Sequence, residues 1–142
     1  MTGARLENVR ILIVDDSAYM RVLLSSVLRT FGVHEFRAVE SAPDAIHQLQ
    51  KFQADMAIVD WMMEPVDGIE FVKHLRHSKI NWLRLLPVVM LTGHTGAEHI
   101  ATAKAAGVNS FLGKPFTPNA LYNQIVHILR TPNEFIYKIA ET

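Results

Sequence analysis

The chain has 142 residues and a mass of 16.0 kDa, which is the size of one compact domain and leaves no room for a second of ordinary size. Fourteen Lys and Arg residues balance fourteen Asp and Glu residues, so net charge gives no support for binding nucleic acid or an anionic membrane. There are no cysteines, which excludes disulfides, thiolate catalysis and cysteine-ligated metal centres.

The apolar segments are short. The longest uninterrupted one, residues 85–91, is seven residues long and contains a proline, whereas a membrane-spanning helix needs about 20 residues. Residues 1–10 contain no apolar segment of the kind found in signal peptides. We therefore expect a cytoplasmic protein with no cleaved targeting segment and no membrane or nucleic-acid partner.

In the first half of the chain, short apolar runs alternate with segments of helical periodicity. Residues 11–14, 36–39 and 56–59 predict buried strands. A helix after the first strand is predicted from an apolar stripe that stops at Gly32. Ser41 is expected to cap a second helix, and Gly68 to open a third. The stripe of the first helix comprises Val22, Leu23, Val27, Leu28 and Phe31.

The alternation continues in the second half. Residues 88–91 predict a fourth strand and residues 110–112 a weaker fifth. Residues 96–106 predict an alanine-rich helix, and Thr117 followed by Pro118 starts another. The tail after Arg130 is interrupted by Pro132, and we interpret it as a short terminal helix that packs on the domain; a docking or dimerisation segment is the alternative.

Five strands alternating with five helices predict an α/β fold, a doubly wound five-stranded parallel sheet with helices on both faces. The domain is expected to cover residues 9–130, with an N-terminal extension at 1–8 and a C-terminal tail at 131–142.

Polar residues follow the predicted strands. In open α/β sheets, ligands bind at the carboxyl ends of the strands. Asp15 and Asp16 follow the first strand, Asp60 the third, Thr92 the fourth and Lys114 the fifth. Crowded carboxylates repel one another unless a cation or proton neutralises them, and oxygen ligands alone favour Mg²⁺. We therefore expect Asp15 and Asp16 to hold Mg²⁺, Asp60 to be the nucleophile that forms an aspartyl-phosphate, and Thr92 to contact the phosphoryl group.

Four segments carry a family resemblance: ILIVDDSAYMR, MAIVDWMMEPVDGIEF, VVMLTGHT and FLGKPFTP. Together they resemble the response-regulator receiver domain of two-component signalling, close to the CheY-like, single-domain chemotaxis type, over residues 9–129. The resemblance implies a flavodoxin-like (βα)5 fold with strand order 2-1-3-4-5. It also implies Asp60 as phosphoacceptor, a Mg²⁺ site made by Asp15, Asp16, Asp60 and the Met62 carbonyl, phosphoryl contacts from Thr92 and Lys114, and a cis bond between Lys114 and Pro115.

The resemblance also assigns a switch and an output surface. Thr92 and Phe111 occupy the switch positions, and Phe111, where the family often has tyrosine, has no hydroxyl to donate. Met62 and His94 stand where the family varies the lifetime of the phosphoryl group; His94 and His99 are expected to be exposed. The output face is predicted to include Ala103, Phe111 and Tyr122. Glu64 stands where the family often has proline, which leaves the shape of that loop open.

These inferences define a phosphorylation-controlled signalling receiver, not a metabolic enzyme. A sensor histidine kinase or phosphotransfer protein would be the donor, a protein of unknown identity the downstream partner, and homodimerisation on phosphorylation stays open. Autodephosphorylation would be the chain's only other reaction. The alternatives are a receiver-like scaffold that works without phosphorylation and a Mg²⁺-dependent aspartyl phosphatase; a flavin-binding protein is a weaker one, because Asp15 and Asp16 stand where a flavin phosphate needs backbone amides.

Overall fold

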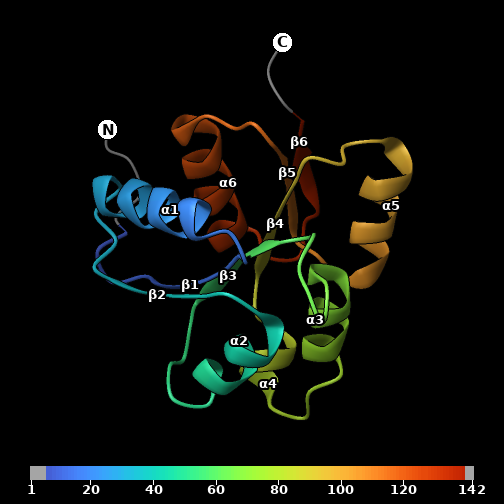
Figure 1. Cartoon of the computed structure of the whole chain (residues 1–142), viewed down its shortest axis with the longest axis horizontal. Helices are drawn as coiled ribbons and strands as arrows, with labels where there is room; N and C mark the ends of the chain where they lie inside the picture. Colours follow the sequence, from blue (N-terminus) through green and yellow to red (C-terminus); the bar gives the residue numbers. More distant parts are fainter. Residues whose placement is uncertain (1–5, 140–142) are drawn as a thin grey trace.

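A six-stranded parallel sheet forms the centre of the molecule in a computed structural model, which describes residues 6–139. The strand order is β2-β1-β3-β4-β5-β6 (Figure 1). The strands are β1 (Arg10–Val14), β2 (Glu35–Val39), β3 (Met56–Asp60), β4 (Val88–Thr92), β5 (Ser110–Gly113) and β6 (Ile136–Lys138). The predicted doubly wound fold is confirmed, and the first five strands follow the expected order 2-1-3-4-5. Residues 1–5 of the predicted N-terminal extension lie outside the described residues.

Helices cover both faces of the sheet (Figure 1). They are α1 (Ala18–Thr30), α2 (Ala42–Leu49), α3 (Gly68–Arg76), α4 (Asn81–Arg84), α5 (Ala97–Ala106) and α6 (Pro118–Arg130). Helices α1 and α6 share one core cluster with the sheet, and α2, α3 and α5 share the other. Strands β3 and β4 are buried at every residue because both of their faces are covered. No helix within residues 6–139 is long and apolar enough to cross a membrane.

Side-chain caps begin four of the helices. Ser17, Ser41, Asp67 and Thr117 each accept a hydrogen bond from a backbone N–H three residues further on. The caps at Ser41 and Thr117 begin helices where the sequence predicted them. Helix α5 ends at Gly107, whose φ of 99° lies in the left-handed region that glycine adopts without strain.

The structure corrects three expectations. The tail contains a strand, β6, instead of a helix, and it pairs in parallel with β5. Where five helices alternating with the strands were expected, the connection between α3 and β4 contains the additional short helix α4. Val22, which was predicted to lie in the apolar stripe of α1, is 70 % exposed, and Leu24 is buried in its place. The rest of the predicted stripe is confirmed, because Val27 and Leu28 are buried and Leu23 and Phe31 pack against the same core cluster.

Candidate functional site

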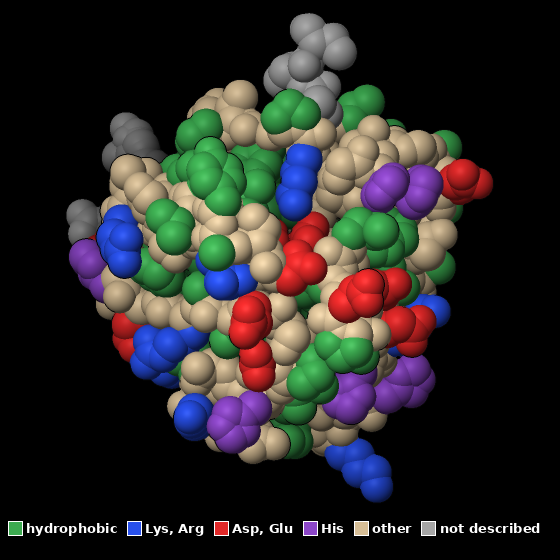
Figure 2. Space-filling model, in the orientation of Figure 1, with side chains coloured by type: hydrophobic (Ala, Val, Ile, Leu, Met, Phe, Trp, Pro, Cys, Tyr) green, Lys and Arg blue, Asp and Glu red, His purple; other side chains and the backbone are tan. Residues whose placement is uncertain are grey.

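Polar side chains gather at the carboxyl ends of four neighbouring strands. Asp15 and Asp16 follow β1, Asp60 ends β3, Thr92 ends β4 and Lys114 follows β5. Since β1, β3, β4 and β5 are consecutive in the sheet, these ends lie side by side. Figure 2 shows acidic side chains directly beside a basic one near the middle of the surface in view. The sequence placed all five residues at this edge, and the fold brings them together there.

Lys114 lies between two buried carboxylates. Its Nζ is 3.0 Å from Asp60 Oδ1 and 3.9 Å from Asp15 Oδ2. Asp15 is 1 % exposed and Asp60 is 6 % exposed, so solvent screens these charges poorly. One ammonium group therefore faces two carboxylates in a region of low dielectric, and a third carboxylate, that of Asp16, is close by.

The backbone around Asp15 is held by its neighbours. Asp15 Oδ1 accepts a hydrogen bond of 2.9 Å from the Ser17 N–H, and the Asp15 carbonyl accepts one of 2.8 Å from Arg21 Nη1. Asp15 Oδ2, in contrast, is buried and has no hydrogen-bond partner. Sequence reasoning missed Arg21, since a basic residue in the first turn of a helix carries no signal of its own. The unsatisfied oxygen leaves an acceptor position aimed at the site.

Burial determines the acidity of the two enclosed carboxyl groups. Burial raises the pKa of Asp15, and the charge of Asp60 raises it further, while the Ser17 N–H bond and Lys114 oppose the change. Burial likewise raises the pKa of Asp60, against the hydrogen bond from Lys114 and a weaker one from the Met62 backbone. Both carboxylates are thus under-neutralised by the protein alone, and an added cation would stabilise their charged forms.

The donor atoms suit a hard divalent cation. Asp15, Asp16 and Asp60 each offer a carboxylate oxygen, and these oxygens lie within 4.8 Å of one another. Asp16 is exposed while the other two are buried, which leaves the cluster open to solvent on one side. An all-oxygen set with an open side, and with the unsatisfied Asp15 Oδ2 among it, fits Mg²⁺, which retains several waters in proteins. The Met62 carbonyl as a further ligand stays a prediction.

Thr92 and Lys114 are connected through the backbone. The Thr92 carbonyl accepts a hydrogen bond of 2.8 Å from the Lys114 N–H. Thr92 Oγ1 accepts one of 2.9 Å from the His94 N–H, and the residue is 1 % exposed. The bond between Lys114 and Pro115 is cis, as is the bond between Glu64 and Pro65. Thr92 therefore lies at the site with its hydroxyl proton available for donation.

A row of aromatic rings starts beside Asp60. Phe111, fully buried, packs edge-on against Trp61 with 6.4 Å between ring centroids. Trp61 packs edge-on against His99 at 5.5 Å, and His99 stacks on His94 at 5.3 Å. His94 is exposed as expected, but His99 is half-buried and its Nδ1 is buried without a partner. The expectation that His99 is exposed was wrong, because the rings come from separate segments and only the folded chain joins them.

The three residues predicted to form the output face do not share a surface. Ala103 and Phe111 are both fully buried in the core on the α5 side of the sheet. Tyr122 packs against Phe31 of α1 on the opposite side, with ring centroids 5.2 Å apart. In this conformation Ala103 faces the sheet and α6 turns Tyr122 toward α1, and the output face stays a prediction.

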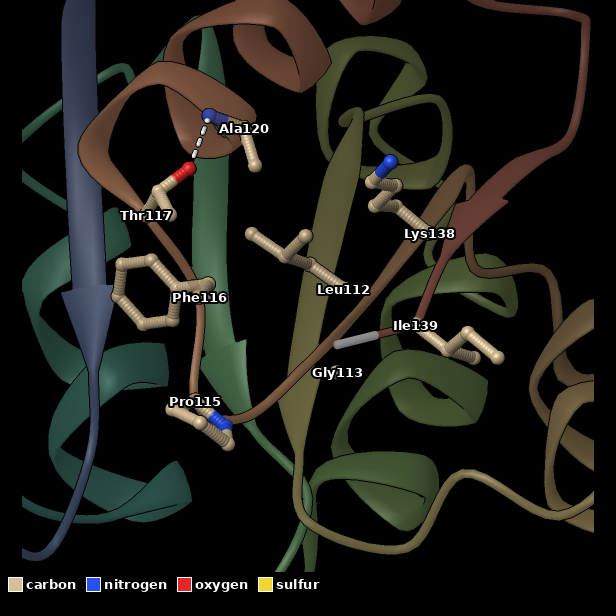
Figure 3. Close-up of a pocket in the computed structure, with 8 residues that line it drawn as sticks. All are labelled: Leu112, Gly113, Pro115, Phe116, Thr117, Ala120, Lys138 and Ile139. Carbon is tan, nitrogen blue, oxygen red and sulfur yellow. Dashed lines mark hydrogen bonds between the residues drawn. The ribbon is translucent and has the colours of Figure 1, made fainter. Parts of the chain in front are cut away.

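The structure also contains a small apolar cavity away from the carboxylates. It has a volume of about 140 Å³ and lies between β5, β6 and the start of α6 (Figure 3). Leu112, Phe116 and Ile139 are among its lining residues, and none of the five polar site residues lines it. The cavity therefore plays no part in the chemistry of the acidic cluster.

Comparison with known proteins agrees with the geometry. The family model described as the response regulator receiver domain matches residues 11–126. The chain is 34 % identical over 119 residues to chemotaxis protein CheY-3 of Vibrio cholerae, covering 84 % of this chain and 90 % of that protein. It is 32 % identical over 124 residues to chemotaxis protein CheY1 of Helicobacter pylori, covering 87 % of this chain and 98 % of that protein. The solved structure of chemotaxis response regulator CheY4 of V. cholerae is similar with a TM-score of 0.77 at 32 % identity, over 84 % of this chain and 98 % of that one.

Proposed function

The chain belongs to the response regulator receiver family, in its CheY-like form, and from that premise we propose that Asp60 accepts a phosphoryl group and that a protein partner reads the result. The family is one of signalling domains, and the chemistry we propose for this chain is limited to self-catalysed phosphoryl transfer and autodephosphorylation. We propose a sensor histidine kinase or a histidine phosphotransfer protein as donor, acting in the cytoplasm.

One observation carries the proposal. Asp60 lies at the end of β3 with its Oδ1 3.0 Å from Lys114 Nζ, and oxygens of Asp15 and Asp16 lie within 4.8 Å of its own. A carboxylate in this position has a cation beside it and a metal site next to it. These are the two groups that neutralise the charge of a transferring phosphoryl group.

The proposed transfer uses groups that are already in position. A carboxylate oxygen of Asp60 attacks phosphorus while the bond from phosphorus to the donor histidine nitrogen breaks, so the nitrogen leaves with its electron pair. Lys114 pairs with a phosphoryl oxygen, and the Thr92 hydroxyl donates to another. Asp15, Asp16, Asp60 and the Met62 carbonyl would hold Mg²⁺, which when bound neutralises phosphoryl oxygens and takes one as a ligand.

The proposed signal starts at Thr92. A new phosphoryl group adds a charge of roughly −1.5 to −2 next to a hydroxyl that can donate to it. Movement of Thr92 toward that group frees space for Phe111, which can respond only through packing because it has no hydroxyl. Met62, which is 57 % exposed, and His94, which is also exposed, stand at the rim, where we propose that they adjust the lifetime of the phosphoryl group.

The deciding experiment is incubation with acetyl phosphate and Mg²⁺, followed by intact mass. With Mg²⁺ we expect a gain of one phosphoryl group. We expect no gain when EDTA replaces Mg²⁺, and no gain in Asp60→Asn. Asp55→Asn is the matched control, because Asp55 is an exposed carboxylate outside the cluster. A gain that survives Asp60→Asn would refute the assignment. Turnover of a small phosphate ester would support the phosphatase alternative, and partner binding that Asp60→Asn leaves unchanged would support the scaffold.

A further inference from the structure

The tail strand β6 covers an edge of the sheet that would otherwise be open. Its residues pair with β5 in the register Ser110 with Ile136, Phe111 with Tyr137, and Leu112 with Lys138. The Ile136 N–H donates a hydrogen bond of 3.2 Å to the Asn109 carbonyl. Without β6, the backbone of β5 would present its unpaired groups to solvent.

Side chains attach the segment before β6 to the domain. Asn109 Nδ2 donates a hydrogen bond of 2.7 Å to the Pro132 carbonyl. His127 Nε2 of α6 is 2.9 Å from Glu134 Oε1. Lys104 Nζ of α5 lies 5.8 Å from the centroid of the Phe135 ring. These contacts are partly exposed, so we expect docking of the tail to be a local equilibrium with a small free energy.

Strand β6 pairs with the strand that contributes Phe111 to the aromatic row. Phe111 packs on Trp61, and Tyr137 is the register partner of Phe111 on the adjacent strand. Register partners project to the same face of a sheet, so the Tyr137 side chain lies beside Phe111. Tyr137 in turn lies 6.4 Å from Phe135, between ring centroids, and Phe135 packs on the same core cluster. The register of β5 and β6 thus places the tail next to Phe111, which packs on the residue after Asp60.

We propose that β6 is a detachable strap whose docking on β5 opposes phosphorylation of Asp60. The inference rests on the function proposed above. Phe111 is 0 % exposed and its register partner Tyr137 is 59 % exposed, so β5, with its buried ring, is the support for β6. When Phe111 moves toward the space that Thr92 leaves, that support recedes and β6 loses packing. The docked strap holds Phe111 in its present position, and release of the strap uncovers the β5 edge for a protein partner.

Hydrogen exchange of the full chain, followed by mass spectrometry, tests the coupling. We expect acetyl phosphate with Mg²⁺ to speed exchange of the segment containing Ile136–Lys138 about tenfold, within the usual range of coupling between two sites. Exchange in strand β2, at the opposite edge of the sheet, should stay unchanged. Tyr137→Ala should speed exchange of the tail even without a phosphodonor. Because coupling is reciprocal, it should also raise the phosphorylated fraction several-fold at limiting acetyl phosphate. Tyr137→Phe, which keeps the ring, is the control and should behave like the unmodified chain.

The outcomes separate this inference from the proposed function. A phosphoryl adduct together with unchanged tail exchange would overturn the strap and leave Asp60 as phosphoacceptor. The same holds if Tyr137→Ala frees the tail but leaves the phosphorylated fraction unchanged or lowers it. Absence of any adduct would overturn both.

Discussion

Two buried carboxyl groups, Asp15 and Asp60, share one ammonium group, that of Lys114. Burial raises the pKa of both, so the folded chain holds protons on them more tightly than the unfolded chain does. Their contribution to stability is therefore fully present below their ordinary pKa and is lost as pH rises through the raised values. At neutral pH, the metal-free site costs the protein stability.

Asp15→Asn tests this at a single residue. The amide oxygen can still accept from the Ser17 N–H, while the negative charge and the unsatisfied Oδ2 are removed. In EDTA at neutral pH, we expect the free energy of unfolding to rise by about 1 kcal/mol. The advantage should shrink as pH falls toward 4, because the aspartate is then protonated. Denaturant titrations of both proteins at several pH values measure this; an advantage that grows as pH falls would contradict it.

Lys114→Gln tests the role of the cation. The substitution removes the charge that lies 3.0 Å from Asp60 Oδ1 and leaves a side chain that can still donate hydrogen bonds. We expect phosphorylation by acetyl phosphate to slow by about a hundredfold, since a positioned donor in a water-poor site contributes that much. Rates from intact mass at saturating Mg²⁺ give the comparison. Lys51→Gln, at an exposed lysine in the turn after α2, is the control, and an equal effect there would show that overall charge, not position, matters.

At the level of strands and helices, the parallel core could be predicted because β1, β3 and β4 are short, β-branched and buried on both faces. The positions of the polar site residues could be predicted from the same alternation, since the carboxyl ends of parallel strands lie at the same edge of the sheet. Strand β6 could not be predicted in this way. Three residues have no measurable periodicity, and they become a strand only because β5 presents an open edge.

Contacts that depend on packing could not be predicted from the sequence either. The row from His94 to Phe111 requires the loop after β3, the start of α5 and β5 to meet. No spacing of residues along the sequence predicts that these segments come together. For the same reason, Ala103 and Tyr122 were placed on one face when the sheet separates them.

The entry into α3 gives a prediction at this scale. A Cβ on Gly68 would collide with the Asp60 carbonyl and lie 3.0 Å from both the Trp61 Cα and the Met90 Cε. We expect Gly68→Ala to lower the free energy of unfolding by about 2 kcal/mol and to slow phosphorylation, because backbone next to Asp60 must shift. Gly93→Ala is the matched control, since nothing lies within 4 Å of its Cβ position and its φ is not positive. Thermal and denaturant unfolding of the two variants decides; equal losses would refute the steric argument.

For the whole molecule, occupation of the acidic cluster should appear as global stability. A ligand that binds only the folded chain stabilises it by about 2.7 kcal/mol at a hundred times its Kd. We therefore expect Mg²⁺ to raise the Tm, by several degrees at saturation for a domain of this size. Scanning calorimetry with MgCl₂ against NaCl of equal ionic strength measures the effect. Asp15→Asn combined with Asp16→Asn should abolish it, and a rise that persists in that variant would place the ion elsewhere.

The two outer strands of the sheet also govern how molecules behave toward one another in concentrated solution. Strand β2 has the exposed charges of Glu35 and Arg37, which discourage edge-to-edge pairing, whereas β6 has the exposed ring of Tyr137 and a single charge, Lys138. With fourteen charges of each sign and a pI near 7.1, no net repulsion keeps molecules apart at neutral pH. Colloidal stability near pH 7 therefore depends on whether the three-residue strand β6 stays paired with β5. Conditions that release β6 should be the first to cause association between molecules, which light scattering would detect.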